Sequence, residues 1–368
     1  MIRITTNGTL RTYQSNLAQS SNALYSAMSK LMTSRNFNAY SADPAAATRA
    51  FKIHSSLNAT RAQASNNTTV LNKFSTAWDI EDDVIDKLTQ DLVQVPALSG
   101  LNETNRSTLN AQGQVLRSAA ESIVQSLNGK YGDDFIFGGA DTKNPPFAID
   151  EEGYLTYRNV RVDADLDQEY IDPVSQKPVP RDPKDPSKGN MTNQDMLDQW
   201  ARDEHLYVDV GLGFRVENGQ VVESTAFDSA ISGLEFLDYG VDEDGDPKNV
   251  VSIALRLSEI YQGYDAETDT WSAAGNEEDA KRLAQKLTAA QEHMSQAHVT
   301  LDTEATYLES NQNRLESTFD SLNTERANIE DVDQVDAILE LSWAQTCYNA
   351  ALQVGANVIP QSLMDYLS

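Results

Sequence analysis

Apolar residues recur every seven positions near the N-terminus, and this spacing predicts a helix that packs against other helices. One apolar residue on every second helical turn forms a narrow stripe along one side of a helix, as in coiled coils. The stripe runs through Leu10, Leu17, Leu24 and Leu31. A helix with so narrow a stripe buries little apolar area by itself, so we expect it to need a helical partner.

A second and longer stripe follows a segment that carries a helix-start signal. Asp43 can accept hydrogen bonds from the first free N–H groups of a helix, and Pro44 suits the first helical position. The pattern predicts a helix over Pro44–Val95, about 75 Å long, which Pro96 and Gly100 end. Its stripe comprises Ala50, Leu57, Ala64, Leu71, Trp78, Ile85 and Leu92.

The strongest heptad pattern lies in the C-terminal part of the chain. Asn276 and the acidic residues directly after it form a helix-start signal. The apolar stripe then runs through Leu287, Met294, Leu301, Leu308, Leu315, Leu322 and Ile329. The predicted helix is about 75 Å long, as is the Pro44–Val95 helix, so we expect these two helices to pair and to return the chain to its starting end.

Two shorter helices complete the helical part. One is predicted from Asn102-Glu103 to Leu127, where Asn128-Gly129 supplies a stop signal. The other is predicted from about Val335 to Val354, and it is apolar over much of its circumference. Because the N-terminal helix offers only one stripe, we expect the remaining apolar surface of the last helix to need another subunit.

The middle of the chain has a different character. Proline residues are frequent between Asp172 and Gly189, which predicts an extended surface segment. Strands are predicted over Tyr154–Val162 and, from the alternating apolar residues, over Val208–Val216. Asn218-Gly219 predicts a tight hairpin turn, and a helix is predicted over Asn249–Tyr261.

These elements predict a mainly α-helical protein with an inserted α+β domain. The N- and C-terminal segments form a long antiparallel helical rod, and the β-containing domain is central. The expected division is an N-terminal assembly segment, the N-terminal half of the rod, an inserted mixed domain, the C-terminal half of the rod and a C-terminal assembly segment. Their residue ranges are 1–40, 41–134, 135–275, 276–331 and 332–368.

Composition narrows the possible partners. The formal net charge is −28 and the isoelectric point is about 4.3. Such a surface repels phosphate groups and anionic lipids, so we expect neither a nucleic acid nor a membrane as partner. The segment Met1–Leu31 contains no apolar run long enough for a cleavable signal peptide. The single cysteine, Cys347, allows no intramolecular disulfide, and we interpret it as a small apolar residue within a helix.

The residues that carry catalysis or bind metals do not form a recognisable pattern. His293 and His298 are five positions apart on a predicted helix, unlike an i, i+4 metal pair, and we interpret the histidines as solvated polar residues. The acidic segment Asp242–Asp246 has its glycine at the fourth position, unlike a calcium loop, so we interpret it as an acidic turn. We predict no catalytic residue, metal or cofactor. The competing interpretation is an enzymatic site within 150–275.

Several motifs occur in the order in which the flagellin superfamily carries them, and within that superfamily they resemble most closely those of the hook-associated proteins. The similar stretches lie within residues 1–147 and 276–368. They are Ile4 to Arg35, Ser41 to Ala50, Phe135-Ile136-Phe137-Gly138-Gly139, Pro145-Pro146-Phe147, Asn311 to Thr318, Asp331-Val332-Asp333 and Pro360 to Leu367. The chain departs from the family at Ser34-Arg35-Asn36-Phe37, where a glycine-lysine-arginine turn is commoner.

The resemblance implies a structural subunit of the bacterial flagellum that joins hook to filament, with filament flagellin as the alternative. It implies partners among other copies of the chain, a neighbouring hook-associated protein, filament flagellin and an export chaperone. It also implies type III export to an extracellular location without a cleaved signal peptide. The residues expected to form the assembly interface are Leu10, Leu17, Leu24, Leu31, Ile338, Leu341, Tyr348 and Leu352.

Overall fold

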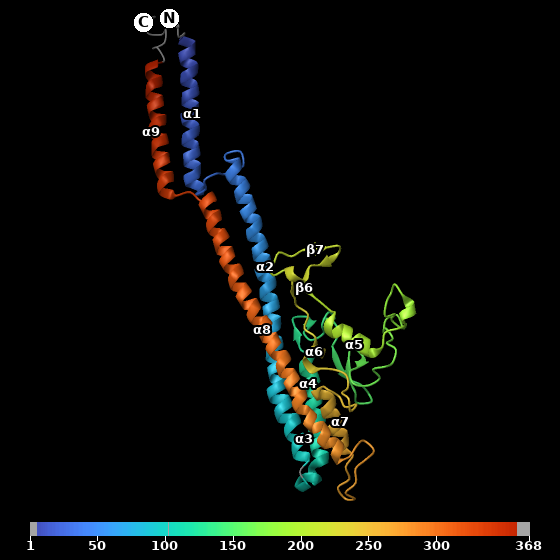
Figure 1. The fold of residues 1–368 in the computed structure, drawn as a ribbon. Helices are drawn as coiled ribbons and strands as arrows, with labels where there is room; N and C mark the ends of the chain where they lie inside the picture. The colour runs from blue at the N-terminus through green and yellow to red at the C-terminus, as the bar shows by residue number, and fades with distance from the viewer. Residues whose placement is uncertain (1–5, 102, 359–368) are drawn as a thin grey trace, which may run out of the picture. The chain divides into compact units, whose positions relative to one another are not determined.

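The computed structural model describes residues 6–101 and 103–358, and the chain divides into two compact units. The terminal unit is built from both ends of the chain, up to residue 62 and from residue 314 onward. The central unit is residues 63–313. Two long helices, α2 (Pro44–Asp83) and α8 (Glu277–Glu330), contribute to both units (Figure 1).

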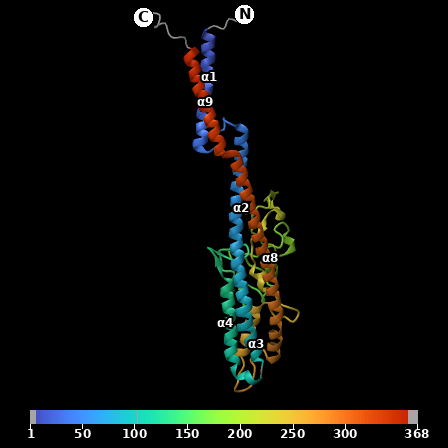
Figure 2. The same ribbon diagram turned by 90° about the vertical axis from the view of Figure 1, so that its left-hand side faces the viewer.

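In the terminal unit, α1 (Thr6–Thr33) packs alongside α9 (Gln334–Val358), and the two helices run in opposite directions (Figures 1 and 2). Both helices were predicted, and α9 extends beyond its predicted bounds of about Val335 to Val354. Asp333 caps α9, because its Oδ1 accepts a hydrogen bond from the backbone N–H of Val335 at 2.8 Å. The predicted end motif Pro360–Leu367 lies outside the described residues, as do Ile4 and Thr5.

The start of α2 at Pro44 is confirmed, with Asp43 Oδ1 accepting hydrogen bonds from the N–H groups of Ala45 and Ala46. The predicted end of this helix is wrong. After Asp83 the chain continues as a π-helical stretch, η1 (Val84–Gln94), and then as α3 (Val95–Gly100). Pro96 does not end the helical course, because it lies at the start of α3, where its missing N–H leaves no hydrogen bond unmade.

The long antiparallel pair is confirmed by contacts within each unit. In the terminal unit the Arg61 guanidinium lies over the Phe319 ring, with 5.4 Å to the ring centroid. In the central unit the buried Asn67 amide donates to the carbonyl of Leu308 at 2.9 Å, and Asn311 donates to Asn67 Oδ1 at 2.8 Å. A buried amide pair must be satisfied by its partner, so it fixes the register of α2 against α8.

The predicted stripe of α8 forms much of the core of the central unit. Leu287, Met294, Leu301 and Leu308 are buried there, and Leu315 is buried in the terminal unit. The start of α8 is also as predicted, because Asn276 and Asp279 satisfy one another's backbone N–H groups in a capping box.

Two further helices pack together in the central unit: α4 (Leu109–Leu127) and α7 (Val250–Gln262). The two helices approach closely at Gly113, whose carbonyl accepts a hydrogen bond of 2.7 Å from the buried Ser258 hydroxyl. The α-helix starts at Leu109 and not at the predicted Asn102-Glu103. Residues Glu103–Thr108 form a 3₁₀-helix, η2, and Asn102 lies outside the described residues.

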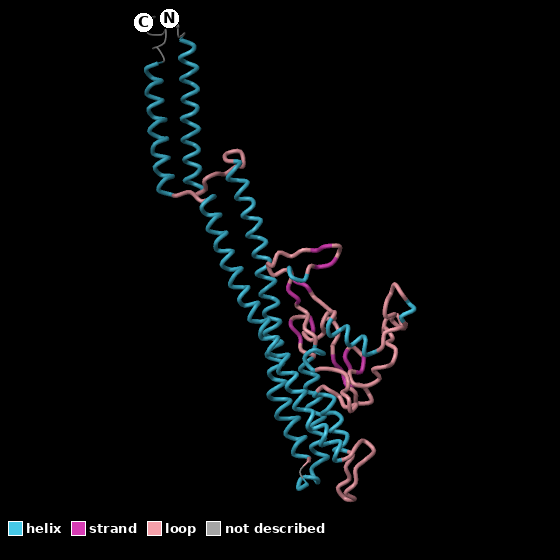
Figure 3. Tube along the Cα trace, in the orientation of Figure 1, coloured by secondary structure: helices cyan, strands magenta, loops and turns pink. Residues whose placement is uncertain are grey.

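The strands, magenta in Figure 3, form small antiparallel sheets, and in sequence they lie between α4 and α7. The paired strands are β1 (Lys130–Tyr131) with β2 (Asp134–Phe135), β3 (Phe147–Ile149) with β4 (Leu155–Tyr157) and β5 (Val160–Arg161), β6 (Tyr207–Val208) with β9 (Phe227–Asp228), and β7 (Val216–Glu217) with β8 (Gln220–Val221). Short helices among them are η3 (Pro186–Lys188), α5 (Asn193–Arg202), η4 (Glu223–Thr225) and α6 (Gly233–Leu237). The predicted fold class, mainly α with an inserted α+β part, is confirmed.

Two predicted strands are broken into smaller pieces. Over Tyr154–Val162 the chain forms a hairpin of β4 and β5, because Arg158 and Asn159 both have positive φ and make a two-residue turn. Over Val208–Val216 only the two ends are strand. The predicted hairpin at Asn218-Gly219 is confirmed, with φ of +54° and +84° joining β7 to β8.

Candidate assembly interface

On the facing sides of α1 and α9, buried and partly buried residues recur at alternating spacings of four and three residues. This is the pattern of knobs-into-holes packing. On α1 the buried and partly buried positions of this seam are Tyr13, Leu17, Ser20, Leu24, Ala27 and Leu31. On α9 they are Ala337, Leu341, Ala344, Tyr348, Ala351 and Gly355. Ala27 and Ala337 are deeply buried, at 0% and 1% exposure. The seam therefore depends on small side chains at its closest points.

Two contacts fix the level at which the helices meet. Near the free end of the pair, a Cβ added to Gly355 would lie 1.9 Å from the Tyr13 hydroxyl oxygen, so glycine is required by close approach. Near the other end, Lys30 Nζ forms an ion pair with Glu340 at 2.9 Å. This ion pair is partly exposed and adds at most about 1 kcal/mol, so it sets register more than stability.

Large apolar side chains of both helices remain exposed outside the seam. On α1 they include a stripe of Tyr25, Met28 and Met32. On α9 they are Val335, Ile338, Leu339, Trp343, Leu352 and Val354. The largest of them, Trp343, is 71% exposed. We call these nine residues the outer apolar surface. An exposed surface with so many large apolar groups is typical of an interaction site.

The eight residues predicted for assembly lie in two different environments. Five are partly buried along the seam between α1 and α9: Leu17, Leu24, Leu31, Leu341 and Tyr348. Leu10, Ile338 and Leu352 are exposed, at 38%, 55% and 43%. The seam residues thus contribute to a contact within one chain, and the exposed ones are available to a partner. Their role in assembly stays a prediction.

The segment that follows α1 is hydrogen-bonded to the segment that precedes α9. We call the residues involved the polar clasp: Ser34, Asn36, Glu330, Asp331 and Val332. The Asn36 N–H donates to the carbonyl of Glu330 at 2.8 Å, and the Val332 N–H donates to the carbonyl of Ser34 at 3.1 Å. The Asn36 side chain also donates to the carbonyl of Asp331 at 2.8 Å. Ser34 has a φ of +53°, the left-handed conformation that the glycine commoner at this turn would adopt without strain.

Comparison with known proteins decides the family of the C-terminal part. Residues 284–367 match the family model of the bacterial flagellin C-terminal helical region. The likeness to this family model lies in the C-terminal part of the chain. This match confirms the resemblance to the flagellin superfamily, and it spans most of α8 and all of α9.

One solved structure supports the fold, and two others are similar to a lesser degree. A protein of Vibrio parahaemolyticus classed as a flagellar hook-associated protein has a TM-score of 0.54 at 14% identity, with 79% of this chain and 100% of that chain covered. FlgL of Bacillus cereus has a TM-score of 0.40 at 16% identity, covering 77% and 99% of the two chains. Flagellar hook-associated protein 3 of Legionella pneumophila has a TM-score of 0.42 at 13% identity, covering 75% and 98%. No curated protein sequence matched the chain.

The acidic turn of this flagellin-like chain is held by cations from α8. The Lys286 ammonium contacts Asp242 at 2.5 Å, Asp244 at 3.0 Å and Asp246 at 2.7 Å. Burial alone would lower the pKa of Lys286, but hydrogen bonds to the three carboxylates raise it. The three carboxylates are close enough to hold a metal ion, yet their shared position is taken by the lysine. The interpretation as an acidic turn therefore fits the geometry.

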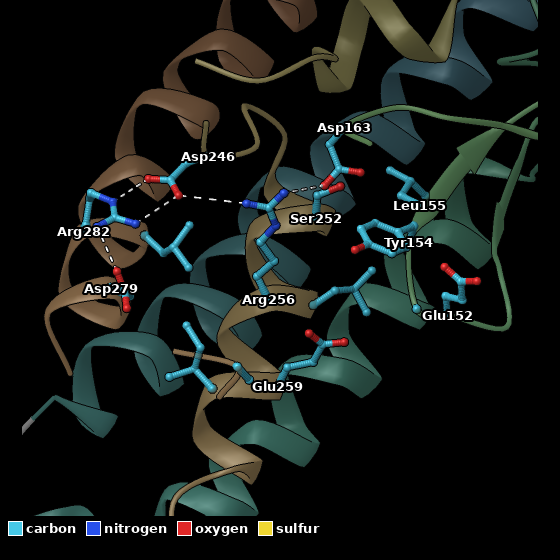
Figure 4. A pocket seen from close by; sticks show the side chains of 15 residues that line it. Glu152, Tyr154, Leu155, Asp163, Asp246, Ser252, Arg256, Glu259, Asp279 and Arg282 are labelled. Atoms are coloured by element: carbon cyan, nitrogen blue, oxygen red, sulfur yellow. Dashed lines mark hydrogen bonds and ion pairs between the residues drawn. The ribbon is translucent and has the colours of Figure 1, made fainter. Parts of the chain in front are cut away.

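A cavity of about 360 Å³ lies beside this turn, between α7, the start of α8 and the β4–β5 hairpin (Figure 4). Arg282 closes one side through hydrogen bonds to Asp246 and Asp279. The Arg256 guanidinium lies between Asp246 and the buried Asp163, at 4.0 Å and 3.8 Å from their carboxylate oxygens (Figure 4). Alternating charges line this cavity, and they connect the acidic turn to the helices.

The structure corrects the interpretation of one histidine and of the cysteine. His298 is not a solvated residue, because its ring packs 4.9 Å from the Trp78 ring and its Nδ1 lies 3.1 Å from Glu81. Burial raises the pKa of the Glu81 carboxyl, and the hydrogen bond to Glu81 raises the pKa of His298. Cys347 lies within α9 as predicted, but its side chain is exposed.

Among residues 6–101 and 103–358, no helix has the length and apolar character to cross a membrane.

Proposed function

We propose that the chain is a structural subunit of the bacterial flagellum that joins the hook to the filament. The observation that carries this proposal is the outer apolar surface of α1 and α9. Helix α9 belongs to the C-terminal part that matches the flagellin family model. A large exposed apolar surface on a helix pair is expected to be covered by other helices in an assembly. The similarity in fold to a hook-associated protein supports the position at the hook.

In this proposal the segments 1–40 and 332–368 form the contacts between subunits. The remaining helical segments, 41–134 and 276–331, form the rod, and the inserted part, 135–275, extends from it. Other copies of the chain occupy the same layer, with a neighbouring hook-associated protein on one side and filament flagellin on the other. An export chaperone covers the outer apolar surface before assembly, and the subunit reaches its extracellular position through the flagellar type III apparatus without a cleaved signal peptide.

Deletion of the C-terminal segment tests the mechanism. A strain that produces the chain without residues 333–368 should form hooks that lack filaments and should release flagellin into the medium, as a strain lacking the whole chain should. Electron microscopy of the flagella and immunodetection of the subunit at hook tips measure both effects. Normal incorporation of the shortened chain would contradict the proposed role of α9.

Filament flagellin is the second candidate, because the matched family model is that of flagellins themselves. The two candidates differ in copy number. A junction subunit forms a thin ring at the hook tip, whereas a flagellin is present in very many copies along the filament. Quantitative labelling of intact flagella with an antibody to the central unit therefore decides between them.

A further inference from the structure

The central unit contains a second cavity, which has an amine in its wall. The cavity measures about 350 Å³ and lies between α2 and the strands β1, β2, β6 and β9. Most of its lining is apolar and includes the side chains of Val70, Leu206 and Val208. Lys73 lies in the wall, and its Nζ donates a hydrogen bond to the carbonyl of Ser229 at 2.8 Å.

Lys73 has no ion-pair partner among the residues that the structure describes. Two carboxylates are near enough to act on it electrostatically, those of Asp134 and Asp228. Asp134 instead forms an ion pair with Lys143. Asp228 pairs with His205 at 2.6 Å. The Lys73 ammonium is therefore partly buried with only a neutral carbonyl as its hydrogen-bond acceptor.

Burial lowers the pKa of Lys73 to about 8, although the Asp134 and Asp228 charges oppose this shift. Near pH 8 roughly half of the Lys73 side chains thus carry a free lone pair, compared with well under about 1% for an ordinary lysine amine. A free amine beside an apolar cavity is a nucleophile with a space for the body of an electrophile.

We propose that this cavity is a site for covalent capture of a small, neutral aldehyde with an apolar body. The amine nitrogen of Lys73 attacks the carbonyl carbon to give a carbinolamine. The carbinolamine then loses its oxygen as water, with the proton that came from the amine, and leaves a C=N bond to Lys73. An engineered apolar cavity of about 150 Å³ holds benzene, so about 350 Å³ is sufficient for one aromatic ring.

The charges around the cavity select among carbonyl compounds. Asp134 lines the cavity and Asp228 lies nearby, so an aldehyde that carries a carboxylate would be repelled. The apolar walls favour a hydrocarbon body over a polar one. A neutral aromatic aldehyde meets both conditions, and it is the appropriate probe.

The full-length protein is incubated with benzaldehyde and cyanoborohydride between pH 6.5 and 9, and each lysine is followed by peptide mass spectrometry. Lys73 should be benzylated with a half-maximal rate near pH 8, and at pH 7.5 at least about tenfold faster than the exposed Lys130 of the same unit. Benzyl alcohol should protect Lys73 and not Lys130, and 4-carboxybenzaldehyde should lose the preference for Lys73. Lys73→Arg should leave only the slow background.

Equal rates at Lys73 and Lys130 would overturn the proposal. Fast modification of Lys73 without protection by benzyl alcohol would also overturn it, because the amine would then be reactive without a binding cavity. The protection experiment uses the unaltered protein, so the test does not depend on the folding of Lys73→Arg. Its outcome is independent of assembly at the hook and leaves the proposed function unaffected.

Discussion

Replacement of Trp343 by serine tests whether the outer apolar surface serves assembly and not folding. The side chain is 71% exposed on α9. A tryptophan buries up to about 250 Å² when it is fully covered, so about 180 Å² is available to a partner. At about 25 cal/mol per Å², complete burial would contribute about 4 kcal/mol per subunit. Ordering of the interface and incomplete coverage reduce this to about 2 kcal/mol, roughly a 30-fold change in the equilibrium for binding.

We therefore expect Trp343→Ser to leave the free energy of unfolding of the monomer within about 0.5 kcal/mol of the unaltered protein, since the side chain has little to lose on unfolding. Incorporation at the hook tip should fall severely. Urea titration of the purified monomer measures the first effect. Quantitative immunogold labelling of hooks from a strain that carries only the variant measures the second.

Val174→Ser is the matched control, because Val174 is a 91% exposed apolar residue in the proline-rich segment of the central unit. This variant should change neither measurement. Two results would refute the reasoning. One is incorporation of Trp343→Ser at the level of the control, and the other is a loss of more than about 1 kcal/mol in monomer stability, which would show that the tryptophan packs within the free chain.

Three further outcomes follow from the packing and the charges. Gly355→Ala should force apart the seam at Tyr13, at a cost of about 1–3 kcal/mol, and should speed hydrogen exchange of α9 amides by about tenfold, an effect that adding Tyr13→Ala relieves. Lys286→Met should lower the free energy of unfolding in urea by about 1–2 kcal/mol. The loss is limited because the buried Asp246 keeps Arg282 as a partner and escapes the full cost of an unpaired charge. The folded state holds the protons of Glu81 and His298 more tightly than the unfolded state, so this pair's stabilisation is present at low pH and is lost as pH rises through the raised pKa values. The free energy of unfolding should thus fall more between pH 6 and 8 in the unaltered protein than in His298→Gln, and equal slopes would contradict this.

The helices were predictable because a heptad pattern repeated many times leaves little freedom for another structure. The stripe from Leu287 to Ile329 specifies one face of one long helix, and the cap at Asn276 specifies its start. The end of α2 was not predictable from Pro96, because a proline can either end a helix or begin the next one. Here a π-helical stretch precedes Pro96, so the helical course continues into α3. That stretch has no clear sequence signal.

The short strands of the central unit show a different limit. Asn218-Gly219 gave the correct hairpin, because both residues adopt positive φ at little cost. Arg158 and Asn159 form the same kind of turn, yet arginine carries no such preference. That turn is stabilised from outside, since Arg158 pairs with Glu204 at 2.7 Å, and a partner so distant in sequence cannot be read from local propensity.

The composition of the candidate site was the hardest part to predict. Sequence reasoning chose eight large apolar residues for assembly; five of them lie along the seam, whereas Leu10, Ile338 and Leu352 are exposed. In the structure Ala27 and Ala337 are deeply buried and Gly355 lies against the Tyr13 side chain, and a hydrophobic pattern does not distinguish these small residues from surface residues. A pattern of large apolar residues therefore marks part of the seam, but it does not identify the small residues at which the two helices come close.

This distribution of side-chain sizes has a consequence for the assembly. Small residues occupy half of the seam, and its leucines and tyrosines are only partly buried, so the contact between α1 and α9 leaves part of their apolar area uncovered. Further apolar area lies outside the seam, in the outer apolar surface, so in the proposed assembly additional hydrophobic stabilisation becomes available when subunits pack together. The polar clasp at Asn36 joins the segments next to both helices within one chain. The two helices would therefore enter the assembly as one preformed pair, which lowers the entropy that each subunit loses on binding.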